Sequence, residues 1–256
     1  MYKDPASGRK IDLVKPALSL GQIVHEVLEG LVSVPAGSRF SSSLVEKYEM
    51  AWVKVSGEKG GFDNRREEND FRARGRVMIE RVENSPGPLA NKAVRMNQDL
   101  PHYFLSEEDN IILCGKVDWL EHVPVDDSVH VIDFKTGRSE VRAGSLQLPI
   151  YSLLLVNCQK RKVSKASYWY LGREDGLKEI PLPDEEEAQQ RVLQIARRVK
   201  RAREEQQLTC PRGAAGCYAC GPFEAICRGE GRLVGQGLYN KDVYFLPEPL
   251  RARSGE

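Results

Sequence analysis

Two aspartates and a lysine in the middle of the chain have the types and spacing of a metal-assisted catalytic site. Two apolar-rich runs, 111–120 and 129–137, flank the turn-like VPVDDS, which predicts a β-hairpin. Asp118 then falls roughly opposite Asp133, and Lys135 shares the face of Asp133 because side chains alternate along a strand. Carboxylates directly across two strands repel each other, so this placement gives the sheet no stability. A divalent cation between them would remove that penalty.

Such a site suits the hydrolysis of a phosphodiester. Magnesium and manganese prefer oxygen-rich sites, and manganese tolerates an imidazole ligand better. A bound cation lowers the pKa of water and polarises a phosphoryl oxygen. Lys135, on the Asp133 face, would orient the water or neutralise charge in the transition state. We therefore expect Mg²⁺ or Mn²⁺ as the cofactor.

The elements around these residues predict an α/β fold with a mixed central β-sheet flanked by helices. Apolar residues at a helical period predict a helix that carries His25, and KASYWYL (165–171) predicts a further strand with core aromatic residues. We expect one domain over residues 1–256, comprising a His helix (17–33), a helical insertion (34–90), a catalytic core (91–171), a basic helix (185–207) and a Cys-rich metal-binding tail (208–230).

Four motifs in fixed order give a more specific indication. They are Gly21-x-x-x-His25, Gly115-x-x-Asp118, Asp133-Phe134-Lys135-Thr136-Gly137 and Gln147-x-x-x-Tyr151. The set resembles the PD-(D/E)XK nuclease superfamily, and specifically its RecB-like branch, which includes AddB/RecB nuclease domains and CRISPR-associated RecB-like exonucleases. The resemblance implies a restriction-endonuclease-like core.

The resemblance also implies roles for individual residues. His25, Asp118, Asp133 and the backbone carbonyl of Phe134 would be metal ligands. Gln147 and Tyr151, four apart on one helix face, would complete the catalytic set with Asp118, Asp133 and Lys135. Taken alone, His25 is better explained as a helix histidine satisfied by Glu29 one turn later, and Tyr151 as a half-buried helix aromatic; the resemblance reverses the preference for His25.

The expected function is a metal-dependent DNA nuclease, with exonuclease action on DNA ends or single strands. The family context is DNA repair and recombination or CRISPR adaptation, with a helicase or a CRISPR adaptation protein as the kind of protein partner. The alternative is an inactive nucleic-acid-binding or scaffold protein that keeps the fold. Because both aspartates and the lysine are present, we favour the enzyme.

Composition limits where DNA could bind. The 256 residues carry a net charge of +1, so a DNA-binding surface must be a local patch. Candidates are Arg138 and, on the helix at 185–207, Arg197, Arg198 and Arg201, although a solvated helix face explains the latter equally well. No apolar run reaches the roughly 18 residues of a membrane span, and the first residues contain no signal-peptide core. A cytoplasmic location is expected.

Four cysteines near the end of the chain predict a second metal site. Their spacing is Cys-x6-Cys-x2-Cys-x6-Cys, at Cys210, Cys217, Cys220 and Cys227. Four thiolates suit a structural zinc or a [4Fe–4S] cluster, and spacing does not choose between them. The resemblance favours iron–sulfur, but family members usually place one cysteine near the N-terminus. This chain has none before Cys114, so either that ligand is lost or Cys210 replaces it. Cys114 and Cys158 are expected to be core residues.

Overall fold

The computed structural model describes residues 2–98, 100–206, 213, 219–248 and 250. The chain divides into two compact units that each combine distant segments. We call the first, Met1–Ile23 with Glu46–Arg76 and Thr209–Glu256, the terminal unit, and the second, Val24–Val45 with Val77–Leu208, the core unit. No helix among the described residues is long and apolar enough to cross a membrane.

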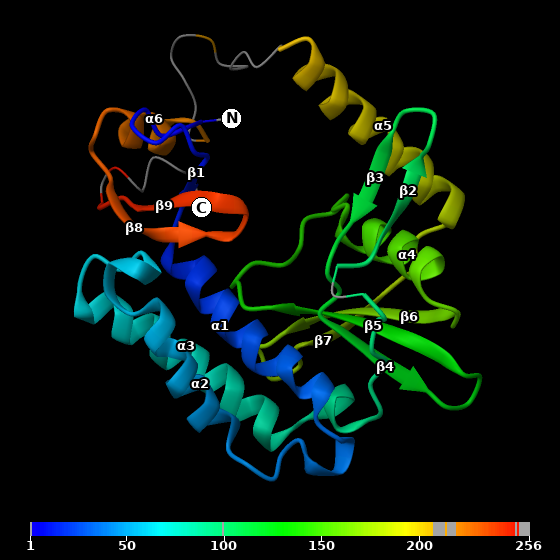
Figure 1. The fold of residues 1–256 in the computed structure, drawn as a ribbon. Coiled ribbons are helices and arrows are strands. Elements are labelled where there is room, and N and C mark those ends of the chain that lie inside the picture. Colours follow the sequence, from blue (N-terminus) through cyan, green and yellow to red (C-terminus); the bar gives the residue numbers. More distant parts are fainter. Residues whose placement is uncertain (1, 99, 207–212, 214–218, 249, 251–256) are drawn as a thin grey trace. The chain divides into compact units, whose positions relative to one another are not determined.

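A four-stranded mixed sheet forms the centre of the core unit (Figure 1). Its strands, in spatial order, are β4 (Trp119–Val123), β5 (Ser128–Lys135), β6 (Val163–Tyr170) and β7 (Leu177–Ile180). The β5–β6 pair is parallel and the two outer pairs are antiparallel. The predicted mixed α/β fold, with mixed sheets flanked by helices, is confirmed. The short edge strand β7 was not predicted.

Helix α4 (Gln147–Cys158) makes the crossover that a parallel strand pair requires. It lies between the sheet and α5 (Glu185–Glu204), and the hairpin of β2 (His102–Ser106) and β3 (Ile111–Cys114) packs against both helices (Figure 1). This double burial explains why α4 is apolar on nearly all sides. The residues that close this second layer are Leu105, Leu153, Ala188 and Val192.

The opposite face of the sheet packs against the last turns of α1 (Pro16–Gly30). The ring of His25 meets Phe134 edge-on with centroids 5.7 Å apart, and Phe134 lies 6.0 Å from Trp169 of β6. Because alternate residues face opposite ways, Asp133 and Lys135 face α4 whereas Phe134 faces α1. Strand β5 therefore passes between two helices that can both contribute side chains at its end.

The apolar run 111–120, predicted as one strand, is two strands in two sheets. β3 ends at Cys114 and pairs with β2, and β4 begins only at Trp119. A side chain at Gly115 would put its Cβ 2.9 Å from a methyl group of Leu154 on α4, so the chain passes close to the helix where the strand breaks. Cys114 is exposed and not a core residue, because the β2–β3 hairpin has one open face.

The terminal unit contains a three-stranded sheet built from both ends of the chain. β1 (Ile11–Leu13) pairs in parallel with β9 (Lys241–Phe245), which pairs antiparallel with β8 (Arg232–Gly237). Helix α6 (Gly221–Cys227) packs on this sheet through Ala225 and Ile226. The predicted Cys-rich tail thus contains one short helix in its described part, whereas Cys210 and Cys217 lie outside the described residues.

Helices α2 (Leu44–Trp52) and α3 (Arg65–Asn84) occupy the stretch predicted as a helical insertion. Both helices contribute residues to both units. Within the terminal unit, Glu68 accepts hydrogen bonds from the Trp52 indole and the Ser56 hydroxyl. The domain boundaries inferred from the sequence remain predictions.

We expect the Arg39→Met substitution to destabilise the core unit by about 2–4 kcal/mol, because it leaves buried carbonyl groups without a donor. Arg39 is 3% exposed, and its guanidinium donates to four backbone carbonyls, those of Leu31, Val34, Leu89 and Asn91. Hydrogen exchange of the amides in β4 and β5 would measure the loss. The same change at exposed Arg138 is the control, and equal protection in both variants would contradict the assignment.

Candidate active site

The site begins where the β4–β5 ladder ends. The last paired residues are Trp119 and Ile132, so Phe134, two residues further along β5, has no strand partner on that side. Its N–H donates to Asp118 Oδ2 at 2.8 Å, and its carbonyl oxygen lies 3.1 Å from His25 Nε2. Buried backbone groups need partners, and here two side chains replace the missing strand. The backbone of β5 thereby brings Asp118 and His25 together.

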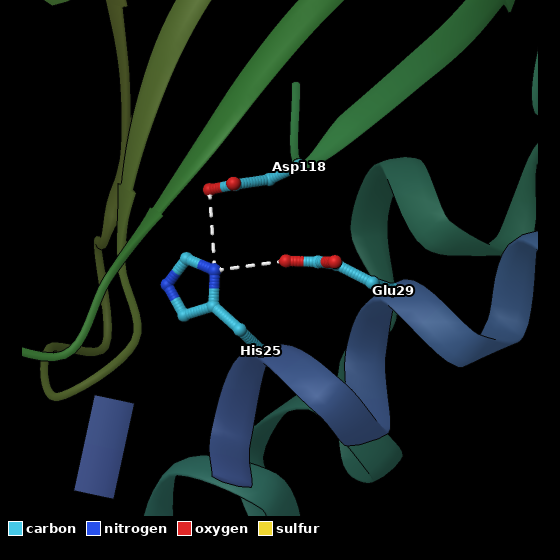
Figure 2. Close-up of side chains that lie close together, drawn as sticks. All are labelled: His25, Glu29 and Asp118. Atoms are coloured by element: carbon cyan, nitrogen blue, oxygen red, sulfur yellow. Dashed lines mark hydrogen bonds and ion pairs between the residues drawn. The ribbon is translucent and has the colours of Figure 1, made fainter. Parts of the chain in front are cut away.

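Three side chains form one end of the site (Figure 2). His25 Nδ1 lies 3.1 Å from Glu29 Oε1 and 3.5 Å from Asp118 Oδ2, and ligand atoms of the three residues all lie within 4.8 Å of one another. Burial disfavours the charged ring, but the hydrogen bonds and negative charges of Asp118 and Glu29 outweigh it and raise the pKa of His25 to about 10. Glu29 also forms an ion pair with Lys116.

Asp133 forms the other end of the site together with residues of β5 and α4. The Lys135 ammonium lies 2.5 Å from Asp133 Oδ2 and donates to Gln147 Oε1 at 2.5 Å. The Gln147 amide donates to Asp133 Oδ1 at 2.5 Å and to the Tyr151 hydroxyl at 3.2 Å. Burial, followed by the charge of Asp118, raises the pKa of Asp133 to about 6. The structure therefore joins the acid, the lysine, the amide and the phenol in one network.

The donor atoms fit a hard divalent cation. Asp133 is 1% exposed, and its Oδ2 lies 2.5 Å from the Lys135 ammonium. Two neighbouring ligands of an octahedral ion with bonds of about 2.1 Å lie about 3 Å apart. The separation of 3.1 Å between His25 Nε2 and the Phe134 oxygen matches that spacing. Together with Asp118, these groups offer one nitrogen and three oxygen donors, a set that suits Mn²⁺ or Mg²⁺.

The arginines predicted to bind DNA lie apart from this network. Arg138 is exposed in the loop after β5, and Arg197 forms a 2.6 Å ion pair with Asp109. Arg198 and Arg201 are exposed on α5 and line one groove with Arg197. Within the described part of the chain, none of these four arginines forms a hydrogen bond with Asp118 or Asp133. Of the predicted sulfur ligands, Cys220 precedes α6 and Cys227 ends it.

Two charged residues at the site were not predicted as functional. The sequence indicated Glu29 only as a structural partner of His25, through its position four residues later on the same helix. Lys116 lies within the Gly115-x-x-Asp118 motif, but nothing in the sequence connects it to Glu29. Their ion pair forms because the irregular segment between β3 and β4 runs beside α1.

The end of β5 thus brings together Asp133 and Lys135 of the strand with Asp118 and His25 from neighbouring segments. A family model described as the PD-(D/E)XK nuclease superfamily matches residues 3–228. The chain belongs to this superfamily, and its membership supports a nuclease. No curated protein matches the sequence.

We expect Asp118→Asn to weaken manganese binding at least tenfold, because the amide keeps an acceptor for the Phe134 N–H but loses the ligand charge. Glu29→Gln should weaken binding about 10–100-fold if Glu29 orients the His25 ring, as carboxylate partners of ligating histidines do. Calorimetric titration of the full chain with manganese measures both effects. Asp175→Asn, in an exposed turn, is the matched control and should bind as the parent does. Parent-like affinity in Asp118→Asn would exclude this site.

Proposed function

We propose that the protein is a Mg²⁺- or Mn²⁺-dependent DNA nuclease that acts as an exonuclease on DNA ends or single strands. The single observation that carries the proposal is the network at the end of β5. Asp133 is 1% exposed and pairs with Lys135, and Gln147 holds both side chains in place. A buried ion pair next to a second carboxylate adds little stability by itself, so this arrangement supports a functional site.

His25, Asp118, Asp133 and the Phe134 carbonyl would hold the cation, which supplies Lewis-acid polarisation and a lower pKa for water. Lys135 would face the reacting phosphate and neutralise charge that develops on it. Gln147 fixes Lys135 and Asp133 at once, since its amide contacts both. Tyr151 is 8% exposed and supports Gln147 from the same helix face, so it acts as a positioning residue.

The finer assignment rests on the RecB-like order of the motifs. It suggests a role in DNA repair and recombination or in CRISPR adaptation, with a helicase or an adaptation protein as partner. The exposed groove of Arg197, Arg198 and Arg201, with Arg138 in the loop after β5, would contact the phosphates of the substrate. Contacts of this kind weaken with salt, since bound counterions are released on association.

We expect Asp133→Asn and Lys135→Ala to lower metal-dependent DNA cleavage by about 10²–10⁴-fold, because each removes charge from the reacting centre. The measurement uses end-labelled single- and double-stranded DNA with manganese, and with chelator as the blank. Lys178→Ala, an exposed lysine on β7, is the matched control. Cleavage by Lys135→Ala at the parent rate would refute the catalytic assignment. A parent protein that binds DNA without cutting it would indicate a scaffold instead.

We also propose a four-sulfur site at Cys210, Cys217, Cys220 and Cys227, with a [4Fe–4S] cluster favoured over zinc. Anaerobic purification should give a brown protein with broad visible absorbance and about four irons per chain. Changing Cys220 or Cys227 to serine should remove the colour, whereas the same change at exposed Cys114 should not. A colourless protein with one zinc would keep the ligands and change the metal. A folded protein free of both metals would exclude the site.

A further inference from the structure

The aromatic strand β6 carries two tyrosines on the face of the sheet that also holds the proposed catalytic acid and lysine. β6 pairs in parallel with β5, and the register places Tyr168 beside Asp133 and Tyr170 beside Lys135 (Figure 1). Paired residues of neighbouring strands face the same side of a sheet, so all four side chains face α4. The aromatic run of β6 therefore borders the candidate active site.

The ring of Tyr168 lies next to the Lys135 ammonium. The ammonium nitrogen is 5.1 Å from the centroid of this ring, which is within the range of a cation–π contact. Tyr168 is 5% exposed and the Lys135 side chain is 20% exposed, so water screens the contact only weakly. Tyr170 has other partners, because its hydroxyl accepts from the Val141 N–H and Arg173 lies over its ring. Of these two tyrosines, Tyr168 is the one that contacts the lysine.

The phenol of Tyr168 stays neutral beside the acid and the lysine. Burial raises the pKa of Tyr168, a hydrogen bond with Ser145 opposes that rise, and the charge of Asp133 adds to it, so that the net direction is upward. A neutral phenol adds no negative charge that would repel a phosphate. The ring face is therefore the part of Tyr168 that acts on Lys135.

The Lys135 ammonium has three neighbours of different chemical kinds. They are the Asp133 carboxylate, the Gln147 amide oxygen and the ring of Tyr168. Under the proposed function Asp133 is also a metal ligand, whereas an aromatic ring face does not compete for a hard cation. A lysine side chain is long and flexible, so a defined position of its ammonium requires contacts of this kind. The ring supplies one that leaves the carboxylate available.

We propose that Tyr168 is a positioning residue for Lys135, whose ammonium its ring keeps directed toward the reacting phosphate; the inference rests on the proposed function. Tyr168 acts through Lys135 and contacts neither the substrate nor the cation. The role belongs to the ring and not to the hydroxyl. It differs from core packing, which another apolar side chain of similar volume would also provide.

The first measurement is cleavage of a single-stranded DNA oligonucleotide by the full chain in manganese. We expect Tyr168→Leu, which removes the ring, to lower kcat about tenfold with an unchanged KM. Tyr168→Phe keeps the ring and should cleave at nearly the parent rate. In Lys135→Ala, adding Tyr168→Leu should cause no further loss, because the two residues act as one unit. Tyr103→Leu, which loses a ring in the layer between α4 and α5, is the matched control with parent kinetics.

The second measurement does not depend on activity. An amine-reactive acetylating reagent labels lysines of the folded protein, and mass spectrometry gives the rate at each position. We expect Lys135 to be labelled about threefold faster in Tyr168→Leu than in the parent and in Tyr168→Phe. Exposed Lys160, after α4, is the internal control with equal rates in all three proteins. Manganese affinity should also be equal in all three, because the proposed ligands remain. If Tyr168→Leu does not fold, Tyr168→Met serves as the variant without the ring.

The outcomes separate this inference from the proposed function. An equal loss of kcat in Tyr168→Phe and Tyr168→Leu overturns it, as does a further loss when Tyr168→Leu is added to Lys135→Ala. Unchanged labelling of Lys135 overturns it as well, and so does weaker manganese binding in Tyr168→Leu, which would mean general damage to the site. A parent protein that cuts no DNA refutes the proposed function, and the labelling rates then decide by themselves whether Tyr168 positions Lys135.

Discussion

The arrangement of the site depends on one backbone constraint, the unpaired edge of β5 beyond Ile132. Because β4 starts at Trp119, the N–H and carbonyl of Phe134 must find partners other than a strand. The Asp118 carboxylate accepts a hydrogen bond from the Phe134 N–H, and the His25 ring lies against the Phe134 carbonyl. Both partners come from segments distant in sequence, so satisfying a single residue's backbone gathers the carboxylate and the imidazole. If β4 were longer, it would pair with this edge, and the Phe134 backbone would no longer need Asp118 and His25 as partners.

The same strand end carries a buried charge that must be compensated. Asp133 is 1% exposed and lies near a second carboxylate, and both effects raise its pKa to about 6. Lys135 and Gln147 offset part of that cost, yet replacing buried ion pairs by apolar residues is often neutral or stabilising. Stability alone therefore does not explain this network. Helix α4 is apolar on its other sides, so it can support the network without exposing it.

The sequence predicts the parts of this structure that depend on local pattern. Apolar periodicity places the His helix within one residue of its start, and strand alternation puts Asp133 and Lys135 on the same face. The break between β3 and β4 is not predictable, because it depends on the approach of Gly115 to α4. The pairing of the three-residue strand β1 with β9 is not predictable either, because nothing in the local sequence of one strand identifies the other as its partner.

His25 shows why two sequence interpretations that seem opposed can both describe one residue. A helix histidine satisfied by Glu29 and a histidine that ligates a metal would use different ring nitrogens. Nδ1 lies against Glu29, whereas Nε2 faces the Phe134 carbonyl at the strand end. A carboxylate on one nitrogen fixes the ring orientation and makes the other nitrogen a stronger ligand once its proton leaves. The i, i+4 spacing of His25 and Glu29 is therefore compatible both with a purely structural histidine and with a metal ligand oriented by a carboxylate.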